Sequence, residues 1–197
     1  MRVHVVDPPA YTPPYDHALC AALVRAGAEV TLFTTRFAHG TVPEPEGYAV
    51  ERAFYAHTPE RLSGRGRRAA RLAQHVPDML RYRRRAREAD VVHFQWLSVQ
   101  QLDRRLLPRG RPLVLTAHDV LPREPTPGQR AAQRALYERV DAVVVHTEAG
   151  RERLTGELGI DPARVTVIHH GAFTHLRNIA DPLPLAPELA VDRKSVV

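Results

Sequence analysis

Leu113-Val-Leu-Thr-Ala-His118-Asp119 is the stretch that decides the fold, because it is a short, continuously apolar run that ends on a histidine. The same ending recurs in three other runs, which are Asp90-Val-Val-His93, Asp141-Ala-Val-Val-Val-His146-Thr147 and Arg164-Val-Thr-Val-Ile168-His169-His170-Gly171. Runs of this kind are typical of strands buried on both faces of a parallel sheet. Ligands bind outside the carboxyl ends of such strands. The four runs therefore predict histidines at the edge where an open α/β sheet binds its ligands.

The rest of the chain alternates between strand and helix patterns. Further strands are predicted at Arg2–Val6, Glu29–Thr34 and Tyr48–Phe54. Helices are predicted at Asp16–Ala26, Arg65–Glu88, Leu97–Leu107, from Pro127 to Arg139, and from a cap at Thr147 to Leu158. This spacing predicts an α/β fold, a Rossmann-like, doubly wound and mostly parallel sheet with helices on both faces.

Length and composition indicate one cytoplasmic α/β domain. The chain has 197 residues, of which 44% are hydrophobic and 25% charged, with a formal net charge of +6. No apolar stretch approaches the ~20 residues that span a bilayer. The first strand pattern begins at Arg2, which leaves no room for a signal peptide. Cys20 is the only cysteine and lies on a helical pattern, so we expect a buried apolar group in a reducing compartment.

The last residues predict that the natural reading frame continues further. Lys194 is the only lysine, and it lies in Asp192-Arg-Lys-Ser-Val-Val197, a hexapeptide that a common sequencing-library adapter also encodes. We expect a Rossmann-like domain over 1–171, a linker or the start of another domain over 172–191, and a non-native tail over 192–197. A native C-terminus is the alternative, and sequencing the source gene across codon 192 distinguishes the two.

Several common α/β functions lack their motifs. The turn after the first strand, Asp7–Pro14, has no glycine, so it is not the Gly-x-Gly-x-x-Gly turn of a dinucleotide-dependent oxidoreductase. Gly64-Arg-Gly66-Arg-Arg-Ala69 fits that pattern but follows a polar loop rather than a strand. No Gly-Lys-Ser or Gly-Lys-Thr indicates a P-loop, and no serine lies in Gly-x-Ser-x-Gly. Neither cysteine pairs nor His-Glu-x-x-His spacing indicates a metal site.

The four histidine-ending phrases, in this order and spacing, resemble the N-terminal domain of family 4 glycosyltransferases, and the resemblance covers Met1 to about Gly171. It implies half of a GT-B fold, truncated before a C-terminal domain that binds the nucleotide-sugar donor. It also implies sugar transfer to a glycan or lipid-linked acceptor with retention of anomeric configuration, without metal or other cofactor. The alternative is a complete, non-catalytic Rossmann-like binding module.

The resemblance assigns the central role to His118. Its match in the family faces the transferred sugar, and a neutral imidazole both donates and accepts a hydrogen bond. Asp119 is predicted either to orient His118 or polarise the acceptor hydroxyl, or to cap a helix. Further predicted substrate contacts, each with a structural role as the alternative, are His93, Trp96, His146, His170 and Gly171.

Two segments depart from the family pattern. Many members carry a Gly-Gly pair in the first strand–helix loop, where this chain has Tyr11-Thr-Pro-Pro-Tyr-Asp16-His17. Tyr15, Asp16 and His17 are therefore predicted to line the acceptor cleft, with helix capping as the alternative for Asp16. In the family's Pro-His-Gly, His169 replaces the proline.

The segment Arg61 to Arg87 holds ten arginines. Helical spacing predicts an apolar stripe toward the sheet, made of Ala69, Leu72, Val76, Met79 and Ala86. The basic face is either simply solvated or in peripheral contact with an anionic membrane, at the inner face of the bilayer. No nucleic-acid recognition motif accompanies it, so nucleic acid is not an expected partner.

Overall fold

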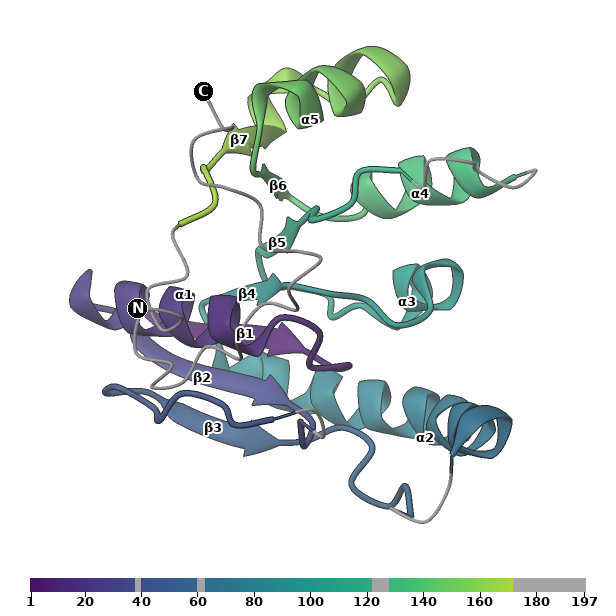
Figure 1. The fold of residues 1–197 in the computed structure, drawn as a ribbon. Helices are drawn as coiled ribbons and strands as arrows, with labels where there is room; N and C mark the ends of the chain where they lie inside the picture. The colour runs from purple at the N-terminus through teal and green to yellow at the C-terminus, as the bar shows by residue number, and fades with distance from the viewer. Residues whose placement is uncertain (38–39, 60–62, 122–127, 172–197) are drawn as a thin grey trace, which may run out of the picture.

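The computed structural model describes residues 1–37, 40–59, 63–121 and 128–171. These residues form a seven-stranded sheet in which every strand pairing is parallel, with the strand order β3-β2-β1-β4-β5-β6-β7 (Figure 1). The strands are β1 (Arg2–Asp7), β2 (Glu29–Thr34), β3 (Ala49–Arg52), β4 (Val91–Phe94), β5 (Leu113–Thr116), β6 (Ala142–Val145) and β7 (Val165–Val167). The Rossmann-like architecture predicted from the apolar runs is confirmed.

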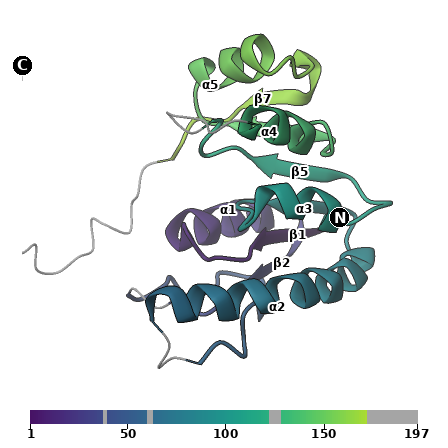
Figure 2. The ribbon, with the colours of Figure 1, turned by 90° about the vertical axis from the view of Figure 1, so that its right-hand side faces the viewer.

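Helices cover both faces of the sheet, as predicted. They are α1 (Pro13–Arg25), α2 (Gly64–Arg85), α3 (Gln100–Leu106), α4 (Gln129–Tyr137) and α5 (Glu148–Glu152), with short helical turns at Ala86–Glu88, Arg153–Glu157 and Pro162–Arg164. Figures 1 and 2 show α2, α3 and α4 together on one face, with α1 on the other. On the face of α1, Tyr15 in its first turn contacts histidines that follow β5, β6 and β7.

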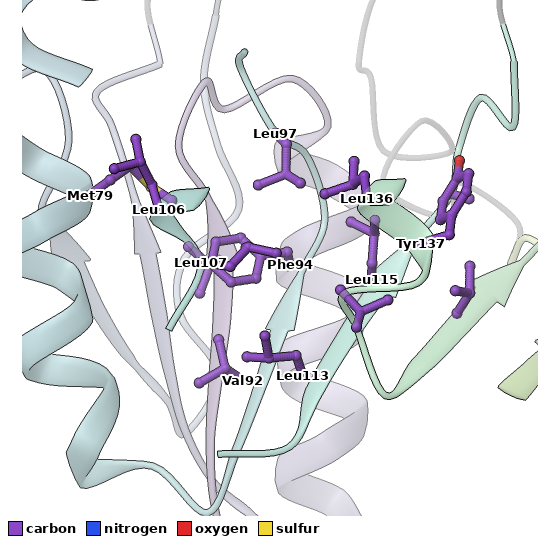
Figure 3. Packing of buried hydrophobic residues seen from close by; sticks show 14 of the residues in the cluster. Met79, Val92, Phe94, Leu97, Leu106, Leu107, Leu113, Leu115, Leu136 and Tyr137 are labelled. Carbon is purple, nitrogen blue, oxygen red and sulfur yellow. The ribbon is translucent and has the colours of Figure 1, made fainter. Parts of the chain in front are cut away.

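The larger core lies between the sheet and the helices α2 to α5. Phe94 of β4 is fully buried beside Leu107, and side chains of α2, β5 and α4 surround them (Figure 3). A smaller core joins α1 to β1 and β2 through Cys20, Val5 and Leu32. Burial of this apolar area, at roughly 25 cal/mol per Å², is the main force that holds the layers together. Cys20 is buried, as its helical position predicts.

Helix α1 begins earlier than predicted. Thr12 precedes it and Pro13 occupies its first turn, where the missing N–H of proline costs nothing. Asp16 consequently lies inside the helix, so the alternative that Asp16 caps α1 is wrong. The cap predicted at Thr147 is confirmed, because its hydroxyl accepts a hydrogen bond from the N–H of Gly150 at 3.0 Å.

The predicted apolar stripe of α2 is only half right. Met79 and Ala86 are buried, but Ala69 is exposed and Leu72 is 54% exposed. Between them, the face that meets the core carries the buried polar side chains of His75, Asp78 and Tyr82. The first turns of α2 therefore leave their apolar residues exposed, and Leu72 lines a cleft instead of joining the core.

Some predictions lie outside the described residues. These are Arg61, Pro127, the linker over 172–191 and the tail over 192–197. Within the described residues, no helix combines the length and the apolarity needed to cross a bilayer.

Candidate functional site

The carboxyl ends of β5, β6 and β7 bring three histidines together with Tyr15, from the first turn of α1. The ring of Tyr15 lies 5.1 Å from that of His118, 5.3 Å from that of His146 and 5.0 Å from that of His170. The rings of His118 and His146 are 5.0 Å apart, and those of His146 and His170 are 5.1 Å apart. We refer to Tyr15, His118, His146 and His170 as the histidine cluster. The arrangement follows from parallel strands that all end at one edge.

Trp96, which follows β4, forms one wall of the cluster. Its indole stacks on His118 with ring centroids 4.6 Å apart and an interplanar angle of 7°. The indole N–H donates to the hydroxyl of Thr12 at 3.0 Å, and Tyr11 packs edge-on against the ring at 5.3 Å. Because both its edge and its face are held, Trp96 presents His118 in a fixed orientation. An indole face of this kind also suits contact with a sugar ring or an apolar chain.

The hydrogen bonds of the cluster fix the tautomers of two histidines. Nδ1 of His146 lies 2.9 Å from the carbonyl oxygen of Ile168, so Nδ1 carries the proton and donates. In the neutral ring, Nε2 of His146 is then an acceptor, and Nδ1 of His118 donates to it at 3.3 Å. This leaves Nε2 of His118 as an acceptor, and it is buried without a hydrogen-bond partner among the described residues. A buried acceptor nitrogen of this kind lacks the hydrogen bond that such groups normally make.

Burial keeps His118 neutral. Desolvation, followed by the neighbouring His146, His170 and His93, lowers the pKa of His118 to about 4. At neutral pH the ring therefore accepts a hydrogen bond through Nε2 without taking the proton completely. This state suits the positioning of a hydroxyl and the stabilisation of charge that develops on it.

His93 lies at the end of β4 on the same side of the sheet. Its Nε2 is 2.8 Å from the hydroxyl of Thr116 on β5, and burial lowers its pKa to about 4. It is close enough to affect the pKa of His118, but no ring contact joins it to the cluster in the described part of the chain. The structure thus gives His93 a hydrogen bond to Thr116, next to the histidine cluster and not part of it.

A cleft opens next to the cluster. It has a volume of about 440 Å³ and runs along α1, with Tyr15, His17, Tyr48, His170 and Gly171 among its lining residues. His17 is buried here, and its Nδ1 lies 2.6 Å from the hydroxyl of Tyr48. His17 and Gly171 therefore face the cleft beside the cluster, while Tyr15 and His170 face both.

Asp119 and Asp16 lie outside the cluster. Asp119 is exposed, and its carboxylate makes no hydrogen bond or ion pair among the described residues. It does not cap α4 either, since that helix begins at Gln129 behind Gly128. Asp16 is 1% exposed and points beneath the first strand–helix loop. The geometry gives neither residue a direct contact with His118.

A buried carboxyl pair is a feature that the sequence did not indicate. The side chains of Asp7, at the end of β1, and Asp16 share a hydrogen bond, and both are almost completely buried. Burial, followed by the charge of Asp7, raises the pKa of Asp16 well above its usual range. The pair therefore holds a proton and fixes the loop between Asp7 and α1, because Asp7 also accepts the N–H of Tyr11 at 2.8 Å. In the sequence, the only sign of this pair is that Asp7 directly follows the strand predicted at Arg2–Val6.

No group of three or more His, Cys, Asp or Glu side chains within the described ranges is arranged to hold a metal ion. The rings of the histidine cluster contact one another, and His146 is hydrogen-bonded to His118 and to the backbone of Ile168.

A family model described as Glycosyltransferase Family 4 matches residues 15–175, and this range includes the histidine cluster and all four histidine-ending strands. The chain belongs to glycosyltransferase family 4. The phrases that resemble this family in the sequence are the same ones that build the carboxyl edge of the sheet. No curated protein matches the sequence.

Solved structures share the fold of this family 4 chain. Sucrose-phosphate synthase from Thermosynechococcus elongatus is 14% identical with a TM-score of 0.61, and the match covers 87% of this chain and 48% of that one. Anabaena Alr3699/HepE in complex with UDP is 18% identical with a TM-score of 0.55, over 87% and 44% of the two chains. A putative UDP-N-acetylglucosamine 2-epimerase from Listeria monocytogenes is 13% identical with a TM-score of 0.53, over 84% and 44%. The chain thus spans less than half the length of each of these proteins.

Proposed function

We propose that this chain is the acceptor-side domain of a retaining glycosyltransferase with a GT-B fold. In this proposal a second domain binds a nucleotide-sugar donor, and the sugar passes to a glycan or lipid-linked acceptor held against the histidine cluster. Family membership supports sugar transfer, and the UDP bound in the HepE structure supports a nucleotide-sugar donor. Peripheral contact of Arg61 to Arg87 with an anionic membrane remains a prediction.

The observation that carries this proposal is the unpartnered Nε2 of His118. The nitrogen is an acceptor by the hydrogen bonds of His146, it is buried at the carboxyl edge of the sheet, and Trp96 holds its ring. We propose that the attacking hydroxyl of the acceptor donates to this nitrogen, which aligns the hydroxyl oxygen with the anomeric carbon. Alignment of this kind is worth up to several powers of ten in rate.

The test uses the full-length protein from the natural gene with a panel of nucleotide sugars and glycan or lipid-linked acceptors. We expect release of the nucleoside diphosphate and a product whose anomeric configuration, measured by NMR, equals that of the donor. An inverted product would contradict the retaining mechanism. Binding of a nucleotide sugar without any transfer would favour the non-catalytic binding module.

A further inference from the structure

Two further clefts lie at the same end of the sheet, on the side of β3 and α2. One has a volume of about 640 Å³ and the other about 580 Å³, and Tyr55, Arg67 and Arg71 line both. Arg52, at the end of β3, lines the first, and Arg68 of α2 lines the second. Among the residues that the structure describes, no Asp or Glu lines either cleft. We refer to Arg52, Arg67 and Arg71 together with Tyr55 as the arginine cleft.

Arg71 carries a positive charge without an acidic partner in the described part of the chain. Its guanidinium lies 5.0 Å from the centre of the Tyr55 ring, and its Nε is buried without a hydrogen-bond partner there. Burial and the charge of Arg67 lower the pKa of Arg71, which indicates that two like charges are held close together. Arg71 is half-buried, and a cation held partly out of water beside a like charge gains from an anionic partner, so this arrangement favours an anion from outside the chain.

Some arginines of α2 are paired and others are not. Arg81 forms an ion pair with Asp78, and Arg85 pairs with Glu51 at 2.7 Å and with Glu88 at 3.6 Å. Arg67 and Arg71 form no ion pair with a described residue, and both line the cleft. Exposed Arg84 also has no ion pair with a described residue, so it is their place in the cleft that distinguishes Arg67 and Arg71.

The wall of the cleft is rigid. The carboxylate of Asp103 accepts a hydrogen bond from Nε2 of His75 at 2.5 Å. In the neutral ring, Nδ1 of His75 then accepts a hydrogen bond from the hydroxyl of Tyr55 at 2.7 Å. The hydroxyl of Ser98 lies 2.8 Å from that of Tyr55. The backbone of Tyr55 has φ of 55°, a conformation that costs free energy outside glycine, and its N–H donates to Asp78 at 2.7 Å. The ring under Arg71 is therefore preorganised, which reduces the entropy lost on binding.

The arginine cleft and the histidine cluster are neighbours. Tyr11 lines one arm of the arginine cleft and packs against Trp96, which stacks on His118. A single acceptor molecule can therefore contact both places along the carboxyl edge of the sheet.

We propose that the arginine cleft binds a phosphate or diphosphate group of the acceptor, while the acceptor hydroxyl lies at His118. Guanidinium forks match phosphate oxygens in pairs, and phosphate recognition by arginine is correspondingly strong. The assignment of the anion to the acceptor rests on the proposed function, whereas the binding of a phosphoryl anion does not.

The test measures inorganic pyrophosphate binding to the full chain by calorimetry. We expect the variants Arg67→Gln and Arg71→Gln to weaken binding at least about tenfold, because each removes charge-assisted hydrogen bonds. Arg84→Gln, an exposed position on the same helix, is the matched control and should bind as the wild type does. Circular dichroism melting confirms that the variants are folded, and Arg71→Lys should restore only part of the affinity, because lysine lacks the fork.

Two further arms separate the possible sources of the effect. Co-sedimentation with phosphatidylglycerol vesicles measures a general effect of charge, which would make Arg84→Gln lose as much vesicle binding as Arg71→Gln. That result, together with equal pyrophosphate binding by all variants, would overturn the proposal. His118→Ala should keep pyrophosphate affinity, since it lies outside the cleft. Pyrophosphate binding without any sugar transfer would support the anion site and refute the proposed function. Sugar transfer without pyrophosphate binding would support the proposed function and refute the anion site.

Discussion

At the scale of single residues, the protonation state of His118 follows from where it lies. Burial and its histidine neighbours lower its pKa to about 4, and burial alone does the same for His93. We predict that NMR titration of the ring protons will show both histidines neutral down to a pH near 4. A midpoint above 6 for His118 would contradict the conclusion that burial keeps its ring neutral.

The same shift affects stability in a defined direction. Between about pH 4 and pH 6.5 the unfolded chain binds protons at these two positions and the folded chain does not. The folded state therefore loses stability as the pH falls through this window, and it keeps the contribution at neutral pH.

Asp16 changes stability with pH in the opposite direction. Its pKa is raised by burial and by Asp7, so the folded state binds a proton that the unfolded state has released above about pH 3.9. We predict that unfolding free energy falls as the pH rises above 4, by up to about 1.4 kcal/mol per pH unit from this group, and that Asp16→Asn removes this slope.

Urea denaturation at several pH values measures the slope. Asp90→Asn is the control, because a hydrogen bond from the backbone N–H of Arg2 lowers the pKa of Asp90. That substitution should alter only the acid side, where stability is lost as the pH falls. If the unfolding free energy of Asp16→Asn still fell above pH 4 as steeply as that of the wild type, the carboxyl pair would not hold the proton.

At the scale of elements, the strands were predictable and the helix faces were not. Glu29–Thr34 is a strand with the predicted bounds, because Val30, Leu32 and Phe33 bury their side chains in the core. Tyr48–Phe54 shortens to Ala49–Arg52, and Leu97–Leu107 begins only at Gln100. Local patterns fix the type of an element, but its ends depend on contacts with distant segments.

Helix α2 illustrates why periodicity alone fails. Leu72 and Met79 lie two turns apart on the same predicted stripe, but only Met79 reaches the core. We predict that Met79→Ala lowers the unfolding free energy by about 2–5 kcal/mol, whereas Leu72→Ala changes it by less than about 0.5 kcal/mol. Denaturant titration of the two variants measures this difference, and equal losses would mean that the first turns of α2 are packed.

The candidate site shows the same division. Its strand-end histidines were predictable, since the carboxyl ends of parallel strands share one edge. The carboxyl pair of Asp7 and Asp16, and the chain of hydrogen bonds that links Asp103, His75 and Tyr55, join residues from separate elements. No local pattern marks such pairs, so only the folded structure reveals them.

At the scale of the whole molecule, one edge of the sheet carries both sites. The histidine cluster lies at the ends of β5 to β7, and the arginine cleft lies by β3 and α2, with Tyr11 and Trp96 between them. Family 4 membership agrees with this use of the edge, and the account depends most on His118.

The most direct measurement is the transfer rate of the full-length protein with His118→Ala, compared with His57→Ala as a histidine outside both sites. The account predicts a fall in kcat of about a hundredfold for His118→Ala, because a positioning group for the hydroxyl is removed, with the fold intact by circular dichroism and a near-normal rate for His57→Ala. A near-normal rate for His118→Ala would contradict it.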